Sequence, residues 1–207
     1  MLLYRTRAIG TENVPAEGPV LIAPNHFSQM DHFFVGVYLR RKIRFMAKSQ
    51  LFGPPVLTSI FTHGGVFPVR RGYRDDEAFE TVYTIFDEMQ GSVLVYAEGG
   101  RSRTGGLGDP KPGVGKIALE SGVAVVPVAI YATRSERPWK KFTFPKVSVQ
   151  FGEPVSFPVV EHPTREQQME TSNAVFATVR KMYDGLRDKG RKQVARELKA
   201  EKEASGA

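Results

Sequence analysis

Short apolar runs of strand type alternate with amphipathic helical stretches along most of the chain, and this alternation constrains the fold most. The run 20–23, bounded by Gly18-Pro19 and Pro24, predicts a short buried strand. The stretch 75–90 repeats apolar residues at helical spacing, and Gly91 supplies a stop. Further strands are predicted at 43–47, 66–69, 92–97, 123–131 and 146–151, and further helices at 33–39, at 114–121 and after Thr164. The pattern predicts an α/β fold with a central, largely parallel or mixed β-sheet flanked by helices.

The chain has 207 residues, enough for one domain with a sizeable core. We expect that domain over residues 1–187. Residues 188–207 are rich in charge and are expected to form a tail that is a frayed helix or disordered. The chain has no cysteine, which excludes disulfides, thiolate metal sites and a cysteine nucleophile.

The net charge of +7 favours an anionic partner, and the distribution of the charge along the chain indicates which kind of partner. A basic run at 40–48 directly precedes a segment, 49–69, that carries no Asp, Glu, Lys or Arg. Such a pair fits a surface that rests on an anionic bilayer, where each Lys or Arg contributes roughly 1 kcal/mol. The alternative is an apolar core segment beside a solvated basic face. Gly53-Pro54-Pro55 argues against a membrane-spanning helix, and Arg5 and Arg7 interrupt any apolar leader.

His26 and Asp31 stand five positions apart where a strand pattern gives way to a helical one. If Ser28 is the N-cap of that helix, Asp31 lies in its first turn and His26 lies just outside. The carboxylate can then hold one ring N–H and leave the other nitrogen as a base. The alternative is that Asp31 only completes a capping box with Ser28, which would leave His26 an ordinary loop residue.

Glu98 begins a glycine- and arginine-rich segment, 98–105, at the end of the strand predicted at 92–97. Ligands of α/β sheets gather at the carboxyl ends of strands. The glycines allow a close backbone approach, and guanidinium groups at Arg101 and Arg103 can bind phosphate in bidentate fashion. The segment therefore predicts an anion site, with a solvated turn as the alternative. Arg70 and Arg71 follow another predicted strand, but a basic turn there is weak evidence alone.

Several other functions lack their motif. No G-x-S-x-G elbow is present, so a serine hydrolase of that type lacks its nucleophile. The segment 113–117 is not a phosphate-binding P-loop, because its first glycine is misplaced and no Ser or Thr follows the lysine. The four histidines make no recognisable metal set, and no nucleic-acid-binding module is present.

Four ordered blocks between Asn25 and Tyr131 resemble the glycerolphosphate acyltransferase superfamily, specifically the 1-acylglycerol-3-phosphate acyltransferases. The first block is N-H-x-x-x-x-D from Asn25 to Asp31. The second is Gly64-Gly65-Val66-Phe67 with Arg70, and the third is Tyr96-Ala97-Glu98-Gly99-Gly100-Arg101-Ser102. The fourth is the apolar run around Pro127.

The resemblance implies an enzyme that transfers a fatty acyl group from acyl-CoA or acyl carrier protein to a glycerol-phosphate hydroxyl, as in phospholipid biosynthesis. It implies His26 as general base and Asp31 as the residue that orients it, with no covalent intermediate. The implied substrate-binding residues are Arg70, Glu98, Gly99, Arg101 and Ser102. It implies no cofactor and no metal. The expected acceptor is 1-acylglycerol 3-phosphate, which would give phosphatidic acid, and the expected location is peripheral, on the cytoplasmic face of a membrane.

The chain departs from the family pattern at two places. Gly100 stands where the family has threonine, and Tyr96-Ala97 stands where it has Phe-Pro. Both changes could alter acceptor choice without removing Glu98 or Arg101. The acceptor could instead be glycerol 3-phosphate, a lysophospholipid or a glycolipid. A non-catalytic lipid- or phosphate-binding module is the other alternative, although retention of both His26 and Asp31 speaks against it.

Overall fold

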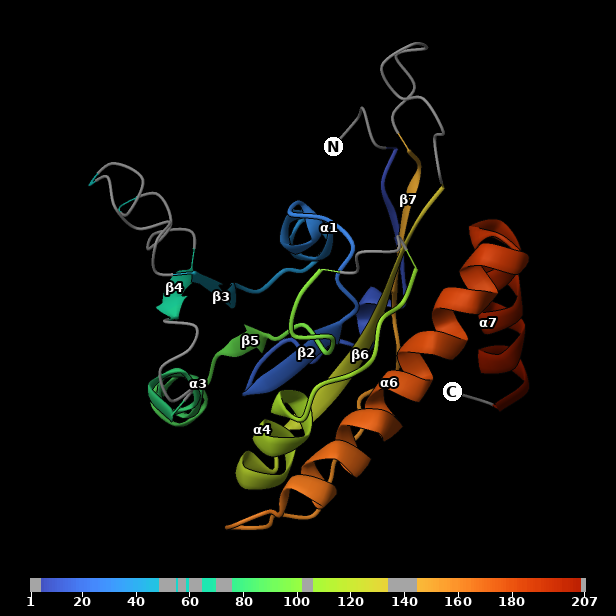
Figure 1. Ribbon diagram of the computed structural model, residues 1–207. Helices are drawn as coiled ribbons and strands as arrows, with labels where there is room; N and C mark the ends of the chain where they lie inside the picture. Colours follow the sequence, from blue (N-terminus) through green and yellow to red (C-terminus); the bar gives the residue numbers. More distant parts are fainter. Residues whose placement is uncertain are drawn as a thin grey trace.

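The computed structural model describes residues 5–48, 55, 59, 65–69, 76–101, 106–133 and 145–205. Its centre is a seven-stranded sheet in the order β1-β7-β6-β2-β5-β3-β4 (Figure 1). The strands are β1 (Arg7–Ile9), β2 (Val20–Pro24), β3 (Ile43–Lys48), β4 (Val66–Val69), β5 (Ser92–Leu94), β6 (Ala124–Ala132) and β7 (Val147–Phe151). All neighbouring strands pair in parallel except β6 and β7, which are antiparallel. The predicted mixed, largely parallel sheet is confirmed.

Strand β1 is the element of the sheet that the sequence did not reveal. It has only three residues, begins with the exposed Arg7 and has no fully buried position. Its register against β7 places Arg7 opposite Ser148, at the sheet's edge. A strand this short and polar carries no apolar periodicity, so only its partner strand defines it.

Apolar side chains on both faces of the sheet create two buried layers. In β2, Leu21 and Ala23 belong to one core cluster, whereas Val20 and Ile22 belong to the other. This alternation is the two-residue period of a strand buried on both sides, and it explains why β2 reads as a continuous apolar run.

Helices cover both layers. They are α1 (Asp31–Gly36), α3 (Asp76–Asp87), α4 (Gly113–Ser121), α6 (Arg165–Asp188) and α7 (Arg191–Ser205), with a 3-10 turn η1 at Thr11–Asn13. Helices α3, α4 and α6 pack on one face, and α1 packs on the other through Phe34 and Val35 (Figure 1). Helix α6 begins where Thr164 predicts, because Thr164 and Gln167 form a complete capping box. No helix in the described part of the chain is both long and apolar enough to cross a bilayer.

The charged segment 188–207, expected as a frayed helix or disordered tail, contains helix α7. Val194 of α7 is buried in the same core cluster as the inner face of α6, and Leu198 packs against that cluster. Lys202 reaches back to Glu12, with 2.6 Å between Nζ and Oε1. Helix α7 therefore packs against the rest of the fold, and the division between 187 and 188 stays a prediction.

The basic run at 40–48 includes one arginine that holds the fold together. The guanidinium of Arg41 donates to the carbonyls of Pro15 at 2.6 Å and Gly18 at 2.5 Å. Gly18 precedes β2, so these bonds lie at the amino edge of the parallel strands. Arg41 therefore braces that edge, and contact of the basic run with a membrane stays a prediction. The apolar segment 51–54 and most of 56–64 lie outside the described residues.

Candidate active site

The candidate site lies at the carboxyl edge of the sheet, where β2 and β5 end side by side. Asn25 follows β2 directly and is buried. Its side-chain amide donates to the carbonyl of Ile130 at 3.1 Å, and its oxygen accepts the Ile130 N–H at 2.7 Å. This two-bond clamp ties the end of β2 to β6 and fixes where the next residue, His26, leaves the sheet.

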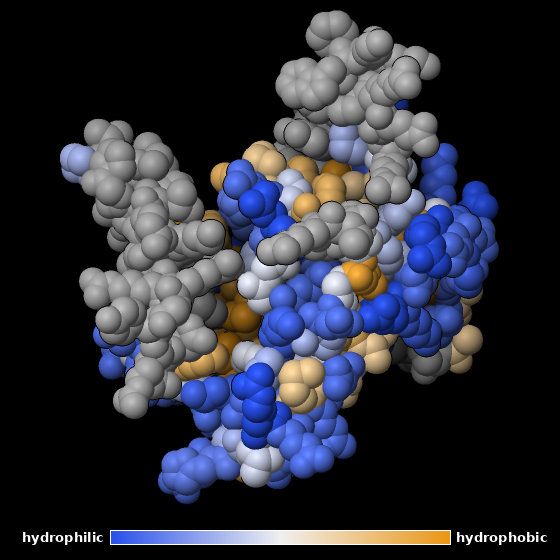
Figure 2. Space-filling model, viewed as in Figure 1, coloured by the Kyte–Doolittle hydropathy of each residue, from blue (hydrophilic) through white to orange (hydrophobic). Residues whose placement is uncertain are grey.

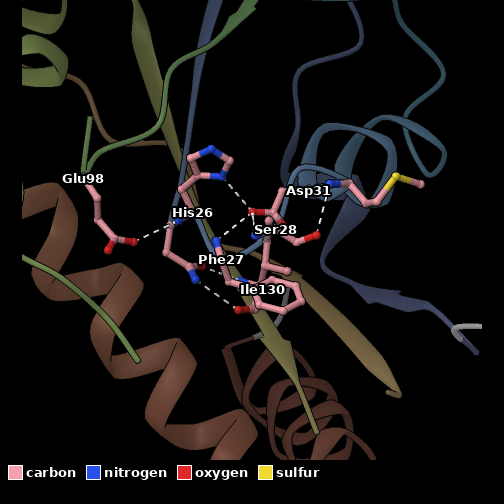
Figure 3. A network of polar contacts seen from close by, with 8 residues as sticks. His26, Phe27, Ser28, Asp31, Glu98 and Ile130 are labelled. Atoms are coloured by element: carbon pink, nitrogen blue, oxygen red, sulfur yellow. Dashed lines mark hydrogen bonds and ion pairs between the residues drawn. The ribbon is translucent and has the colours of Figure 1, made fainter. Parts of the chain in front are cut away.

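His26 and Asp31 form the predicted pair (Figure 3). The distance between His26 Nδ1 and Asp31 Oδ2 is 2.8 Å, the Asp31 side chain is completely buried, and the His26 side chain is 15% exposed. A neutral imidazole that donates from Nδ1 carries its lone pair on Nε2. The arrangement therefore leaves Nε2 as the ring nitrogen that can take a proton from a substrate.

Asp31 does more than hold His26. The same Oδ2 accepts the backbone N–H groups of Phe27 at 2.7 Å and Ser28 at 2.8 Å. Three donors on one buried oxygen stabilise the charged carboxylate, and they fold the chain between the two residues into a tight loop. This loop brings together two side chains that a continuous helix would point apart.

The predicted capping box is present only in half. Asp31 accepts the Ser28 N–H as a box requires, but the Ser28 hydroxyl accepts from Met30 N at 3.1 Å and not from Asp31 N. Helix α1 accordingly begins at Asp31, with Met30 as its N-cap and no side-chain cap. The helix therefore starts later than Ser28 as N-cap predicts, and Asp31 both orients His26 and closes the turn.

Tyr96, two residues after the end of β5, supports the histidine ring. The two ring centroids are 3.7 Å apart and the planes differ by 15°. Burial raises the pKa of the Tyr96 hydroxyl, and the nearby Asp31 charge adds to the rise. In the sequence, Tyr96 stands out only as a departure from the family's phenylalanine. The one sequence feature that could have indicated its role is its position at the end of a predicted strand, as His26 is at the end of another.

Glu98 was predicted to bind substrate, and in the structure its carboxylate accepts hydrogen bonds from the backbone around the site (Figure 3). Oε1 accepts the His26 N–H at 2.9 Å, and Oε2 accepts the Gly108 N–H at 2.6 Å. Burial raises the pKa of Glu98, although the two N–H groups lower it in part. Glu98 therefore links the ends of β2 and β5 to the loop at Gly108.

The structure describes only two of the other predicted substrate-binding residues, Gly99 and Arg101. Gly99 has a left-handed φ of 64° and donates its N–H to the Tyr96 carbonyl at 2.9 Å, so it closes the turn after β5. Arg101 is exposed directly beyond that turn. Arg70 and Ser102 lie outside the described residues, as do Arg71 and Arg103. The structure thus joins His26, Asp31, Glu98 and Gly99 in one constellation and places Arg101 next to it in sequence.

Replacing Glu98 with glutamine tests whether this residue positions His26 or binds the acceptor. The amide nitrogen of glutamine would face a backbone N–H, so one of the two bonds is lost, at a cost of about 1–3 kcal/mol. We expect kcat to fall about tenfold while KM for the acceptor stays unchanged. Steady-state kinetics with Glu153→Gln, at an exposed carboxylate, provides the control. A rise in acceptor KM at constant kcat would instead identify a direct substrate contact.

The raised pKa of Glu98 also predicts a pH dependence of stability. A carboxyl group with a raised pKa binds its proton more tightly in the folded chain than in the unfolded one. Its contribution therefore declines as pH rises from the ordinary value of 4.5 through the folded pKa. Over that interval wild type should lose unfolding free energy relative to Glu98→Gln, as measured by denaturant unfolding at each pH. Parallel curves for the two proteins would contradict the prediction.

Among the described residues, no group of three or more His, Cys, Asp and Glu side chains is arranged to hold a metal ion. The local chemistry is that of a carboxylate-oriented imidazole beside buried aromatic and apolar walls. Such an arrangement suits general-base activation of a hydroxyl.

Comparison with known proteins identifies the family of the chain. The family model described as Acyltransferase matches residues 5–131, more than half of the chain. The chain is 29% identical over 133 residues to a chloroplastic 1-acyl-sn-glycerol-3-phosphate acyltransferase, LPAT1, of Arabidopsis thaliana, which covers 63% of this chain and 37% of that protein. It is 29% identical over 127 residues to the 1-acyl-sn-glycerol-3-phosphate acyltransferase of Borreliella burgdorferi, covering 61% of this chain and 51% of the relative. The chain thus spans between a third and about half of the length of these relatives.

The fold has a solved counterpart. The crystal structure of PlsC, the 1-acyl-sn-glycerophosphate acyltransferase from Thermotoga maritima, superposes with a TM-score of 0.69 at 25% identity. The superposition covers 90% of this chain and 74% of PlsC. The chain thus shares the α/β fold of a solved acyltransferase. The chain belongs to the Acyltransferase family.

Proposed function

We propose that the chain is an acyltransferase that moves a fatty acyl group from an acyl thioester to a hydroxyl of a glycerol-phosphate acceptor. The most suitable acceptor is 1-acylglycerol 3-phosphate, and the product is then phosphatidic acid. The observation that carries the proposal is the 2.8 Å contact between His26 Nδ1 and the buried Asp31 carboxylate, which directs Nε2 outward. The names of the curated relatives and of the structural neighbour support the acceptor class.

The proposed reaction is a direct transfer. His26 Nε2 takes the proton of the acceptor hydroxyl as its oxygen forms a bond with the thioester carbonyl carbon. The resulting oxyanion collapses, the C–S bond breaks, and the leaving thiolate takes the proton back from Nε2. Asp31 stabilises the imidazolium between these two transfers, because its charge faces Nδ1–H. No covalent acyl-enzyme, cofactor or metal takes part.

Arg101 and Arg70 are proposed to hold the acceptor phosphate, and Ser102 is proposed to bind substrate. Arg101 follows the Gly99 turn beside the catalytic pair, and guanidinium groups match phosphate geometry. Arg70 follows β4, whose pairing with β3 places its end at the same carboxyl edge of the sheet. The roles of the three residues are carried over from the family motifs.

Glycerol 3-phosphate is the second candidate acceptor. The glycerol-3-phosphate acyltransferase of Pseudomonas fluorescens is 30% identical over 120 residues, which covers 54% of this chain and 14% of that protein. The two acceptors differ by one acyl chain, so the presence of an apolar surface beside the dyad favours the acylated one.

Peripheral contact with an anionic membrane, on the cytoplasmic face, completes the proposal. Helix α1 and its two cap residues offer the exposed apolar side chains of Met30, Phe33 and Val37 next to the catalytic pair. These residues follow 3-4 spacing and therefore share one face of the helix. A lipid substrate in a bilayer could reach His26 from that side.

A panel of acceptors with a labelled acyl-CoA tests the proposal. Glycerol 3-phosphate, 1-acylglycerol 3-phosphate, a lysophosphatidylcholine and a glycolipid would be supplied in turn, and the products analysed by mass spectrometry. We expect label chiefly in phosphatidic acid. Label in none of the products, with acyl-CoA or with acyl carrier protein as donor, would contradict an acyltransferase function.

A further inference from the structure

A basic hollow lies apart from the catalytic pair. It has a volume of about 700 Å³ and is lined by Arg5, Thr6, Arg7, Val37, Tyr38, Lys146 and Arg191. Four of these seven residues are cations and none is acidic. The cations come from the amino-terminal segment, from the residue before β7 and from the first residue of α7, so three distant parts of the chain converge here.

The charge of the hollow is not neutralised by the rest of the described structure. No carboxylate of the described residues lies within 4.0 Å of the charged nitrogens of the four cations. Cations gathered around one concavity repel one another unless an anion joins them. A volume of this size is within the range of small-ligand sites.

The sheet register places the hollow on the same edge as the active site. Arg7 is in register with Ser148, and Ser148 is opposite Tyr131. Tyr131 directly follows Ile130, the residue that clamps Asn25 beside the catalytic histidine. Strand β1 lies three positions from β2 in the sheet, which is a lateral separation of about 14 Å.

Helix α1 connects the hollow with the catalytic pair. Asp31 is its first residue, and Val37, one residue past its end, lines the hollow, about 9 Å further along the axis. Phe33 lies between them and is 52% exposed, and Val37 itself is 54% exposed, so the connecting surface is apolar. In the space-filling view, apolar surface gathers beside α1 and is bordered by hydrophilic side chains (Figure 2).

We propose that this hollow binds the phosphate groups of coenzyme A, the carrier of the acyl donor. The inference rests on the proposed function, since it names the donor for that reaction. Several clustered cations suit a molecule with several phosphates, and a concave site suits a compact nucleotide better than a flat bilayer surface. The pantetheine arm then follows the apolar face of α1 toward His26, where the thioester reacts.

Binding of coenzyme A itself tests the inference without turnover, because coenzyme A carries no acyl group. The double variant Arg7→Ala/Lys146→Ala removes two exposed cations of the hollow. The control Lys192→Ala/Arg196→Ala removes two exposed cations of α7 that do not line it, so both proteins lose the same charge. By calorimetry, we expect Kd for coenzyme A to rise about tenfold or more in the hollow variant and to stay within about twofold in the control.

Steady-state kinetics and a measurement of binding to lipid vesicles complete the test. In the hollow variant KM for acyl-CoA should rise while kcat at saturation and KM for the acceptor stay unchanged. Equal Kd values in the two double variants, or a wild type that does not bind coenzyme A, would overturn the inference. So would loss of binding to phosphatidylglycerol vesicles with coenzyme A binding intact, which would make the hollow a lipid headgroup site. Coenzyme A binding that depends on the hollow, in a protein with no acyl transfer, would support this site and refute the proposed function.

Discussion

Asp31→Asn is expected to lower kcat by about 10²- to 10⁴-fold. Asparagine keeps nearly the same shape, so the loop from His26 can still form. It loses the negative charge that faces Nδ1–H and that stabilises the imidazolium. It can also turn its amide nitrogen toward the ring, which favours the tautomer with the proton on Nε2 and removes the base.

The same substitution should cost about 1–3 kcal/mol of folding stability, because the bonds from Phe27 and Ser28 to a buried carboxylate are weakened. Kinetics and denaturant unfolding on one preparation separate the two effects. Asp87→Asn, at an exposed carboxylate near the end of α3, is the matched control and should leave both quantities unchanged. A kcat for Asp31→Asn close to that of the control would show that the carboxylate serves only to close the turn.

Gly115→Ala is expected to produce the largest loss of stability. An added Cβ would lie 1.9 Å from the Gln168 carbonyl oxygen and 2.9 Å from the Ser172 N, both in the backbone of α6. Backbone of a packed helix cannot move aside as a side chain can, so α4 and α6 must separate. Overpacking of this kind costs about 3 kcal/mol, which corresponds to a fall in Tm of about 10 °C for a chain of this size.

Gly113→Ala gives the control two residues earlier on the same helix. The nearest atom to its added Cβ would be Phe79 Cζ at 3.9 Å, an ordinary contact. Alanine there should be neutral or stabilise the helix by up to about 1 kcal/mol. Equal melting temperatures for the two variants would contradict the close packing of α4 on α6.

These two glycines show what sequence patterns can and cannot reveal. The run 113–117 could be excluded as a P-loop from its residues alone. That Gly115 is required for the approach of α6 depends on where two helices cross, and the local sequence carries no sign of that crossing. The Gly115 N–H also donates to Ser172 Oγ at 2.8 Å, which fixes the crossing point.

The elements with strong periodicity were predicted well, for a physical reason. Strands β2 and β6 are buried on both faces, and helix α6 has a complete cap, so each is defined by its own residues. Strand β1 and the packing of α7 depend on partners far away in the chain. Short-range patterns do not contain that information.

The same distinction applies to the site. His26 and Asp31 could be paired from their spacing at a strand-to-helix junction, because the contact is local. Glu98 could be selected from its strand-end position, but its two bonds to His26 N and Gly108 N come from tertiary structure. Arg41 looked like part of a basic surface, whereas its bonds to Pro15 and Gly18 make it a brace at the opposite edge.

The most direct test of the central claim is acyl transfer by His26→Ala. The proteins are wild type, His26→Ala and the control His162→Ala, whose imidazole is 91% exposed. Release of coenzyme A and formation of phosphatidic acid from acyl-CoA and 1-acylglycerol 3-phosphate would be followed together, with thermal unfolding to verify the fold. We expect His26→Ala to lose about 10²- to 10⁴-fold in kcat and His162→Ala to match wild type. A folded His26→Ala protein that forms phosphatidic acid at the wild-type rate would contradict the role of His26 as general base.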